Sequence, residues 1–147
     1  MGCDIHLLVE KQLAPDWWVT VDTMGYHKSA ASRNDDGTAS FSWPIAETRN
    51  YHRFAALAGV RGDGPPPRGF PDNLSETAHY MIDMWAGDGH SHSWLPLKEA
   101  AAIFLRTEDL EKDKERASGD PSYFYFNVKD GGEEDLDKYR VVFWFDN

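Results

Sequence analysis

Asp4 and His6 lie two residues apart near the start of the chain, in the alternating stretch Cys-Asp-Ile-His-Leu-Leu-Val-Glu. In a β-strand their side chains project from one face, about 6–7 Å apart along the chain. A second polar group, Asp88, His90 and His92, lies in an Asp-Gly-His-Ser-His segment and shares a side if that segment is extended. Imidazole nitrogens and carboxylate oxygens bind zinc, and manganese accepts the same ligands. If the two segments meet, the predicted metal ligands are Asp4, His6, His90 and His92.

Two other interpretations fit the same residues. His90 and His92 precede a predicted helix in a glycine-containing segment, where polar side chains often bond the backbone groups of a turn. Asp4 and His6 could bond each other at a sheet surface, which would be a purely structural role. A functional polar site without a metal is the remaining alternative, because such clusters occur at functional sites as well as in structural ion-pair networks.

Arginine and tryptophan side chains extend the candidate site. Arg61 and Arg68 flank a Gly/Pro-rich connector at residues 62–67, and an arginine fork matches the geometry of a phosphate. The two arginines could clamp a phosphate; alternatively, Arg61 pairs with a carboxylate or a helix C-terminus. Six tryptophans are too many for one small core to hide with every indole N–H bonded, so some are expected at a groove or an interface. Trp94, next to the histidine pair, is predicted to stack on a base or ring. The predicted ligand-binding residues are His6, Arg61, Arg68, Asp88, His90, His92 and Trp94.

Composition and charge argue against several classes of protein. A length of 147 residues favours one domain. The net charge is −10 and no Lys/Arg run occurs, so duplex nucleic acid is not an expected partner. Cys3 is the single cysteine and is expected to be a buried thiol; a chain without an internal disulfide fits a reducing cytoplasm. No apolar run approaches the roughly 20 residues of a membrane span, so we expect no membrane partner and a cytoplasmic location.

The first half of the chain contains two strands, a loop and a helix by pattern. Residues 3–10 alternate as a strand, an Ala-Pro-Asp turn follows, and residues 17–22 are rich in strand-forming residue types. Residues 24–47 show no period and are predicted to form a long loop. From Asn50 to Val60 apolar residues recur at i, i+3, i+4 and i+7, which predicts a helix with Thr48 as its N-cap.

The second half continues with helices and ends in strands. Ser75 is expected to cap a second helix, a third starts near Pro96, and residues 108–115 alternate acids with bases as on a solvated helix face. Residues 122–128 and 139–146 then alternate as strands. This order predicts a single α+β domain over residues 1–147. Its N- and C-terminal strands are expected to form one mainly antiparallel sheet with about three helices packed on one face.

Five segments spread along the chain carry a resemblance to a known family. They read Met-Gly-Cys-Asp-Ile-His, Arg-Asn-Tyr with Phe-Ala-Ala-Leu-Ala-Gly-Val-Arg, Pro-Arg-Gly-Phe-Pro, His-Ser-His-Ser-Trp-Leu and Val-Val-Phe-Trp-Phe-Asp-Asn. With these motifs the chain resembles a family of short, functionally uncharacterised proteins of bacteriophages and bacteria. The resemblance implies an accessory gene of phage type acting inside a bacterial cell, and no particular activity. It also implies an acidic residue at position 52, where this chain has His52.

Two functions from different classes follow from these observations. The first is binding of a small phosphorylated, nucleotide-derived ligand, with His and Arg on the phosphates and Trp94 on the base. In a phage-type protein such binding would sequester a host defence signal; the 24–47 loop could close over the ligand, and a homo-oligomer could share pockets. The alternative is a divalent-metal-dependent hydrolase or phosphoesterase with zinc or manganese on the Asp/His cluster and Asp88 or His79 as acid/base. A protein-binding inhibitor is a third option. Ligand binding is preferred, because the histidines serve it with or without a metal.

Overall fold

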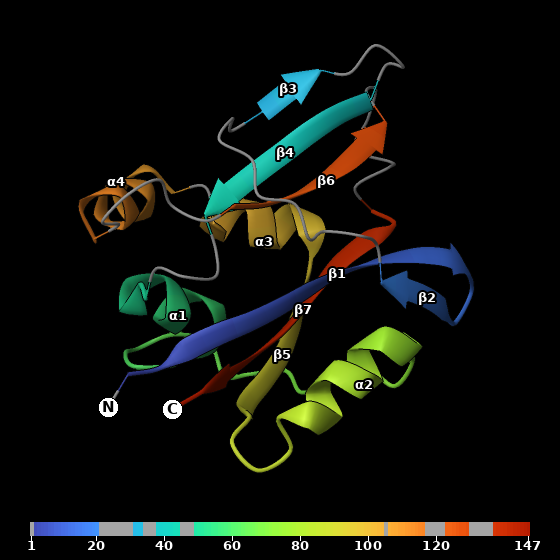
Figure 1. Cartoon of the computed structure of the whole chain (residues 1–147), viewed down its shortest axis with the longest axis horizontal. Coiled ribbons are helices and arrows are strands. Elements are labelled where there is room, and N and C mark those ends of the chain that lie inside the picture. Colours follow the sequence, from blue (N-terminus) through green and yellow to red (C-terminus); the bar gives the residue numbers. More distant parts are fainter. Residues whose placement is uncertain are drawn as a thin grey trace.

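A computed structural model of the chain describes residues 2–20, 31–33, 38–44, 49–104, 106–116, 123–129 and 137–147. The elements in chain order are β1 (Asp4–Ala14), β2 (Trp17–Thr20), β3 (Ala31–Arg33), β4 (Thr38–Pro44), α1 (Tyr51–Ala58), α2 (Glu76–Met84), β5 (His90–Pro96), α3 (Leu97–Phe104), α4 (Thr107–Arg116), β6 (Tyr123–Lys129) and β7 (Tyr139–Asp146). The chain is therefore an α+β protein, as the order of sequence patterns predicts (Figure 1). Within these described ranges no helix has both the length and the apolar character needed to cross a membrane.

A four-stranded antiparallel sheet in the order β2-β1-β7-β5 forms the centre of the fold. β1 pairs with β7 from Asp4 opposite Asp146 to Lys11 opposite Tyr139. The two ends of the chain therefore lie beside each other at one end of the sheet (Figure 1). The prediction that strands from both termini share one antiparallel sheet is confirmed for β1, β2 and β7.

The larger hydrophobic core lies between one face of this sheet and the helices α1 and α3. Ile5 of β1 and Phe143 of β7 pack there with Phe54, Leu57 and Phe104 from the two helices, and none of these side chains is more than 4 % exposed. Each such apolar side chain contributes about 1.5–3 kcal/mol when it is fully buried. The apolar spacing that predicts α1 and α3 therefore marks the helix sides that pack on the sheet.

The N-cap of α1 differs from the predicted one. Asn50 occupies this position, and its side-chain oxygen accepts a hydrogen bond from the backbone N–H of Arg53 at 3.1 Å. Thr48, the predicted cap, lies outside the described residues. The helix ends at Gly59, which adopts a left-handed φ of 66° and donates its N–H to the carbonyl oxygen of Ala55. Glycine is the residue type that adopts this conformation at the lowest cost.

Helix α2 covers the opposite face of the sheet, where Ala78 packs against Leu8 of β1 and Trp144 of β7. It begins at the predicted cap: the Ser75 hydroxyl oxygen accepts a hydrogen bond from the Ala78 N–H at 3.1 Å. Figure 1 shows α2 on one side of the sheet and α1 with α3 on the other. The prediction that the helices share one face does not hold in this respect, because β1 and β7 present apolar side chains on both faces.

A second antiparallel sheet, in the order β3-β4-β6, departs from the prediction of a single sheet. Its strands β3 and β4 fall within residues 24–47, which were predicted to be a loop; the other residues of that segment lie outside the described part of the chain. β6 was expected to join the terminal strands and instead pairs with β4 over its whole length. In β4 the polar Thr38, Ser40 and Ser42 alternate with Ala39, Phe41 and Trp43, a strand pattern of period two that is short within a segment rich in Ser, Asn, Asp and Gly.

A buried ion pair crosses the sheet beneath α2. Arg140 Nε donates to Glu10 Oε1 at 2.6 Å, and the two side chains are 4 % and 0 % exposed. The second carboxylate oxygen of Glu10 accepts from the Ser75 N–H at 2.7 Å, and the guanidinium of Arg140 also donates to Asn73 at 2.8 and 3.0 Å. The Trp18 ring lies 3.9 Å from this guanidinium. These contacts fix the start of α2 against β1 and β7. Burial lowers the pKa of Arg140, and the hydrogen bond to Glu10 acts in the opposite direction.

Candidate functional site

His6 lies on the α2 face of the central sheet, opposite Trp144 in the β1–β7 register. Its Nε2 is 2.8 Å from Asp146 Oδ2, and the two side chains are 25 % and 14 % exposed. The ring centroids of Trp85 and Trp144 lie 4.1 and 5.5 Å from that of the imidazole. One of the two ring nitrogens, Nε2, thus already has a carboxylate partner, and two indoles lie against the ring.

Asp4 shares this face, as the alternation of β1 predicts, but it does not bond His6. Its two carboxylate oxygens accept from Arg49 Nε and Nη2 at 2.7 and 3.0 Å. This bidentate pair lowers the pKa of Asp4. Arg49 therefore occupies the carboxylate that the sequence suggested as a metal ligand.

A bulge in β5 separates the two histidines of the His-Ser-His segment. His90 pairs with Phe145 and Ser93 with Phe143, so one extra residue is inserted between the pairs. Ser91 takes up this insertion with a φ of 53°, in the left-handed region. As a consequence His90 stacks on Phe145 on the α1/α3 side of the sheet, with ring centroids 6.2 Å apart, whereas His92 points to the α2 side.

The predicted set of four metal ligands is therefore not brought together. An extended segment would place His90 and His92 on one side, but the bulge places them on opposite faces. Within the described ranges, the one group of three or more His, Cys, Asp or Glu side chains with ligand atoms within 4.8 Å of one another lies elsewhere, at His52, Glu108 and Asp109. Because Asp4, His6, His90 and His92 do not converge, the hydrolase alternative has no metal site at its predicted ligands.

His92 lies on the α2 face, as His6 of β1 does, and Trp144 of β7 is near both histidines. A Cβ added to Gly89 would lie 3.3 Å from Trp144 Cδ1 and 3.4 Å from His92 Nε2, so these two side chains flank this glycine. Phe70 lies against both of them, with ring centroids 4.5 Å from His92 and 6.4 Å from Trp144. Burial, and secondarily the charge of His90, lowers the pKa of His92. His6 and His92 are thus parts of one aromatic layer on the α2 face, together with Phe70, Trp85 and Trp144.

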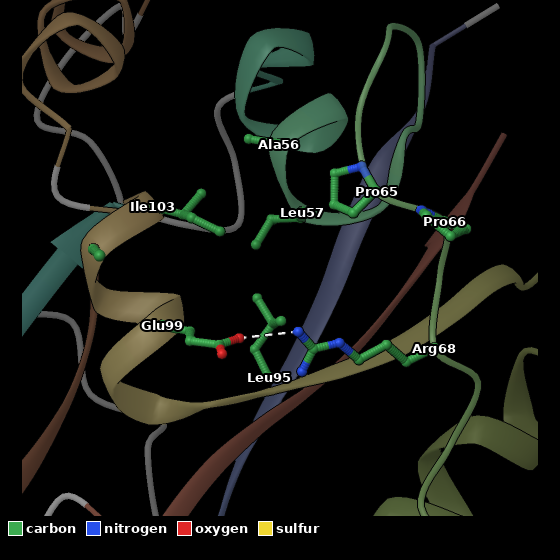
Figure 2. Close-up of a pocket in the computed structure, with 9 residues that line it drawn as sticks. Ala56, Leu57, Pro65, Pro66, Arg68, Leu95, Glu99 and Ile103 are labelled. Atoms are coloured by element: carbon green, nitrogen blue, oxygen red, sulfur yellow. Dashed lines mark hydrogen bonds and ion pairs between the residues drawn. The ribbon is translucent and has the colours of Figure 1, made fainter.

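A pocket of about 330 Å³ lies at a different place, between α1, α3 and the connector that follows α1. Figure 2 shows the Arg68 side chain extending toward Glu99 of α3, and both residues line the pocket. Arg68 Nη2 lies 3.0 Å from Glu99 Oε2, and both side chains are about half exposed. The remaining lining is apolar: Ala56, Leu57, Pro65, Pro66, Leu95, Ala102 and Ile103. One cation and one anion, both about half exposed, therefore line an otherwise apolar hollow.

The connector is held in place at both ends of the pocket. The backbone N–H groups of Arg68 and Gly69 donate to Ser93 Oγ and the His92 carbonyl oxygen at 3.0 and 2.9 Å, so this stretch lies along the outer edge of β5. Near α1, a Cβ on Gly64 would collide with the carbonyl oxygen of Ala55. The glycines of the connector thus allow it to pack closely, which places the Pro65 and Pro66 rings beside α1.

The other predicted ligand residues lie around this pocket or away from it. The guanidinium of Arg68 lies 5.6 Å from the centre of the Trp94 ring, so these two predicted residues are neighbours. Arg61 contacts Tyr51 at 5.6 Å and Asn147 at 3.4 Å and does not line the pocket. Asp88 is exposed and donates its backbone N–H to the carbonyl oxygen of Trp85. The two arginines that the sequence suggested as a phosphate clamp therefore make separate contacts.

Comparisons of the chain with protein-family models, with curated proteins and with solved structures found no match. The resemblance to short phage and bacterial proteins stays a prediction.

Sequence reasoning missed two features of the molecule. The pocket arises from apolar residues of α1, α3 and the connector, and no motif marks residues of these kinds. Asp109 was expected on a solvated helix face, but its side chain is fully buried against His52 of α1. A separation of 57 residues between the two leaves no local signal for this contact.

Proposed function

We propose that the protein binds a small phosphorylated, nucleotide-like ligand in the pocket between α1, the connector and α3. The observation that carries this proposal is a mostly apolar hollow whose lining includes one exposed arginine, Arg68. Ligand sites are typically concave and mostly apolar, with a few polar groups that fix orientation, and measure about 300–1,000 Å³. A pocket near the lower limit of this range suits a mononucleotide, or one half of a larger nucleotide.

Arg68 is suited to exchange its present partner for a phosphate. Its pair with Glu99 is exposed at both ends, and such surface pairs contribute only about 0–1 kcal/mol. A phosphate offers the guanidinium two acceptor oxygens and a larger negative charge. Glu99 would then turn toward solvent, and Trp94 would keep the guanidinium stacked on its ring.

The apolar walls favour a ring system over a flexible polar chain. Proline rings at positions 65 and 66 and the side chains of Leu57 and Ile103 offer flat apolar contact to a base. This differs from the interaction predicted from sequence, in which Trp94 stacks on the base; here Trp94 supports the arginine. The base is recognised by shape more than by hydrogen bonds, which predicts modest discrimination between purines.

Retention of the ligand is favoured over its cleavage. Among the nine residues that line the pocket, Arg68 and Glu99 are the polar ones, and the other seven carry no nucleophile or base. Together with the phage-type resemblance, binding without turnover supports sequestration of a host defence signal as the biological use. Ligand recovered unchanged after denaturation of a loaded complex would agree with this proposal, and recovery of cleaved products alone would contradict it.

A thermal-shift screen tests the binding step. The wild-type protein is melted with AMP, cyclic nucleotides and ADP-ribose, each at rising concentration. A ligand at 100 times its dissociation constant stabilises the folded state by about 2.7 kcal/mol, which raises the melting temperature of a domain of this size by several degrees. Arg68→Gln should abolish most of the shift, because it removes the cation without removing the apolar walls.

Lys112→Gln provides the matched control. Lys112 is exposed on α4 and does not line the pocket. Lys112→Gln removes one positive charge, as Arg68→Gln does, but leaves the pocket unchanged. Equal loss of binding in both variants would indicate a nonspecific charge effect, and an undiminished shift in Arg68→Gln would place the ligand elsewhere. Either result contradicts the proposal.

A further inference from the structure

Three side chains with metal-ligand chemistry meet where the N-termini of α1 and α4 approach each other. His52 Nδ1 lies 2.8 Å from Asp109 Oδ1 and 3.9 Å from Glu108 Oε1. His52 and Glu108 are exposed, whereas the Asp109 side chain is 0 % exposed. The group thus combines an imidazole and two carboxylates, of which the Asp109 carboxylate is buried and the other two side chains are open to solvent.

Asn50 holds the two helix ends in fixed relation. Its side-chain oxygen caps α1 through the Arg53 N–H, and its side-chain nitrogen donates to the Asp109 carbonyl oxygen at 3.3 Å. This amide is 1 % exposed. Arg53 is equally buried and donates to the Phe104 carbonyl oxygen at 3.3 Å, just before α4. His52 and Asp109 are therefore positioned by the fold and not only by their mutual hydrogen bond.

Asp109 is left with an unsatisfied oxygen. Its Oδ1 meets His52, but its Oδ2 is buried and has no hydrogen-bond partner. Buried polar atoms normally have a partner, and a buried carboxylate with half of its acceptors unused is costly. The unpartnered oxygen belongs to the same carboxyl group as the one already directed at the cluster. A cation bound by both oxygens of this carboxylate would give Oδ2 a partner.

We propose that His52, Asp109 and Glu108 form a binding site for a divalent transition metal, with zinc as the best match. Zinc takes nitrogen and carboxylate ligands at about 2.0–2.2 Å in tetrahedral geometry, which sets ligand atoms about 3.3 Å apart. The two measured separations, 2.8 and 3.9 Å, lie on either side of that value. A metal would replace the hydrogen-bonding proton between His52 and Asp109, and the exposed Glu108 would turn inward.

Charge balance supports a divalent ion at this place. Helix N-termini carry partial positive charge, which alone would repel a cation. Two carboxylates outweigh this effect, and a doubly charged ion would leave the cluster neutral. Three protein ligands leave a fourth position for water or an external ligand. The inference is independent of the pocket proposed above, because none of these three residues lines it.

Zinc binding to the full chain tests this assignment. Protein stripped with chelator and returned to chelator-free buffer is titrated with zinc chloride by calorimetry, and bound metal is counted by mass spectrometry after gel filtration. One zinc per chain is expected. His52→Asn and Glu108→Gln each should weaken binding by more than about 10-fold, since loss of even an outer-shell partner has that effect. Glu108→Gln leaves the bond between His52 and the buried Asp109 intact, so it tests the site even if His52→Asn lowers the stability of the fold.

Two matched variants make the test specific. His79→Asn and Glu111→Gln alter an exposed histidine on α2 and an exposed glutamate on α4 that lie outside the cluster, and zinc affinity should match that of the wild type. Substoichiometric zinc in the wild-type protein would overturn the proposal. Equal affinities of His52→Asn and His79→Asn would overturn it as well, as would loss of binding in His6→Asn with retention in His52→Asn.

Discussion

The buried pair of Glu10 and Arg140 should contribute strongly to the stability of the fold. Glu10→Gln removes the carboxylate charge with little change in shape and leaves the Arg140 guanidinium, 4 % exposed, without an anion. Breaking a buried pair on one side costs about 3–5 kcal/mol, which is a large part of the roughly 5–15 kcal/mol that stabilises a typical protein. The retained bonds to Asn73 and the Trp18 ring place the expected loss near the lower end of that range.

Urea unfolding followed by tryptophan fluorescence measures this loss. With an m-value of about 2 kcal/mol per molar urea, a loss of 3 kcal/mol lowers the midpoint by about 1.5 M. Arg68→Gln serves as the comparison, because it breaks an exposed pair that contributes at most about 1 kcal/mol. Arg140→Met in the Glu10→Gln background should recover part of the stability, since no unpaired charge is then buried. A midpoint for Glu10→Gln no lower than that of Arg68→Gln would refute the reasoning.

Four further predictions concern titratable groups. Arg49→Ala should raise the pKa of Asp4 toward its ordinary value of 3.8, measured by carboxyl-carbon NMR, because the bidentate bond that lowers it is lost; an unchanged pKa would contradict this pair. His90→Asn should raise the pKa of His92, since the charge of His90 contributes to lowering it. In the wild type the lowered His92 pKa means that the unfolded state binds more protons than the folded state. The stability should therefore decrease as the pH falls from 6.5 toward the folded-state pKa of His92. Urea midpoints that rise as the pH falls through this window would contradict this prediction. Cys3 is buried and its pKa is raised by burial, so a thiol reagent should react much more slowly with native than with unfolded protein, and equal rates would contradict this.

The apolar periodicities predict the helices well, because packing and local preference agree there. Ser75 precedes a run with helical apolar spacing and caps α2 as expected. The placement of helices on both faces was also encoded, in the uninterrupted apolar run Val-Val-Phe-Trp-Phe of β7. A strand buried on both faces shows such a run, whereas alternation marks a strand with one solvated face. Arg140 and Asp146 lie near the two ends of β7 and give residues 139–146 the appearance of simple alternation, although the centre of the strand is apolar on both faces.

The histidine pair shows where local patterns cease to be informative. A His-Ser-His segment in regular strand geometry places both rings on one side, but the left-handed backbone of Ser91 inserts a bulge. A serine in this conformation is uncommon, and tertiary pairing with β7 imposes it. The same limitation applies to Asp109, whose burial depends on contact with α1. Chemistry that depends on such long-range contacts could not be predicted from spacing.

The central claim is that a phosphorylated small molecule occupies the pocket beneath Arg68. A ¹H–¹⁵N NMR titration of the full chain with AMP and with ADP-ribose tests this most directly. The account predicts saturable shifts of the Leu57, Arg68, Glu99 and Ile103 amide signals, with the Arg68 Nε–H signal moving as its partner changes from carboxylate to phosphate. No shifts at millimolar nucleotide, or shifts confined to the aromatic layer of His6, Trp85 and His92, would contradict it.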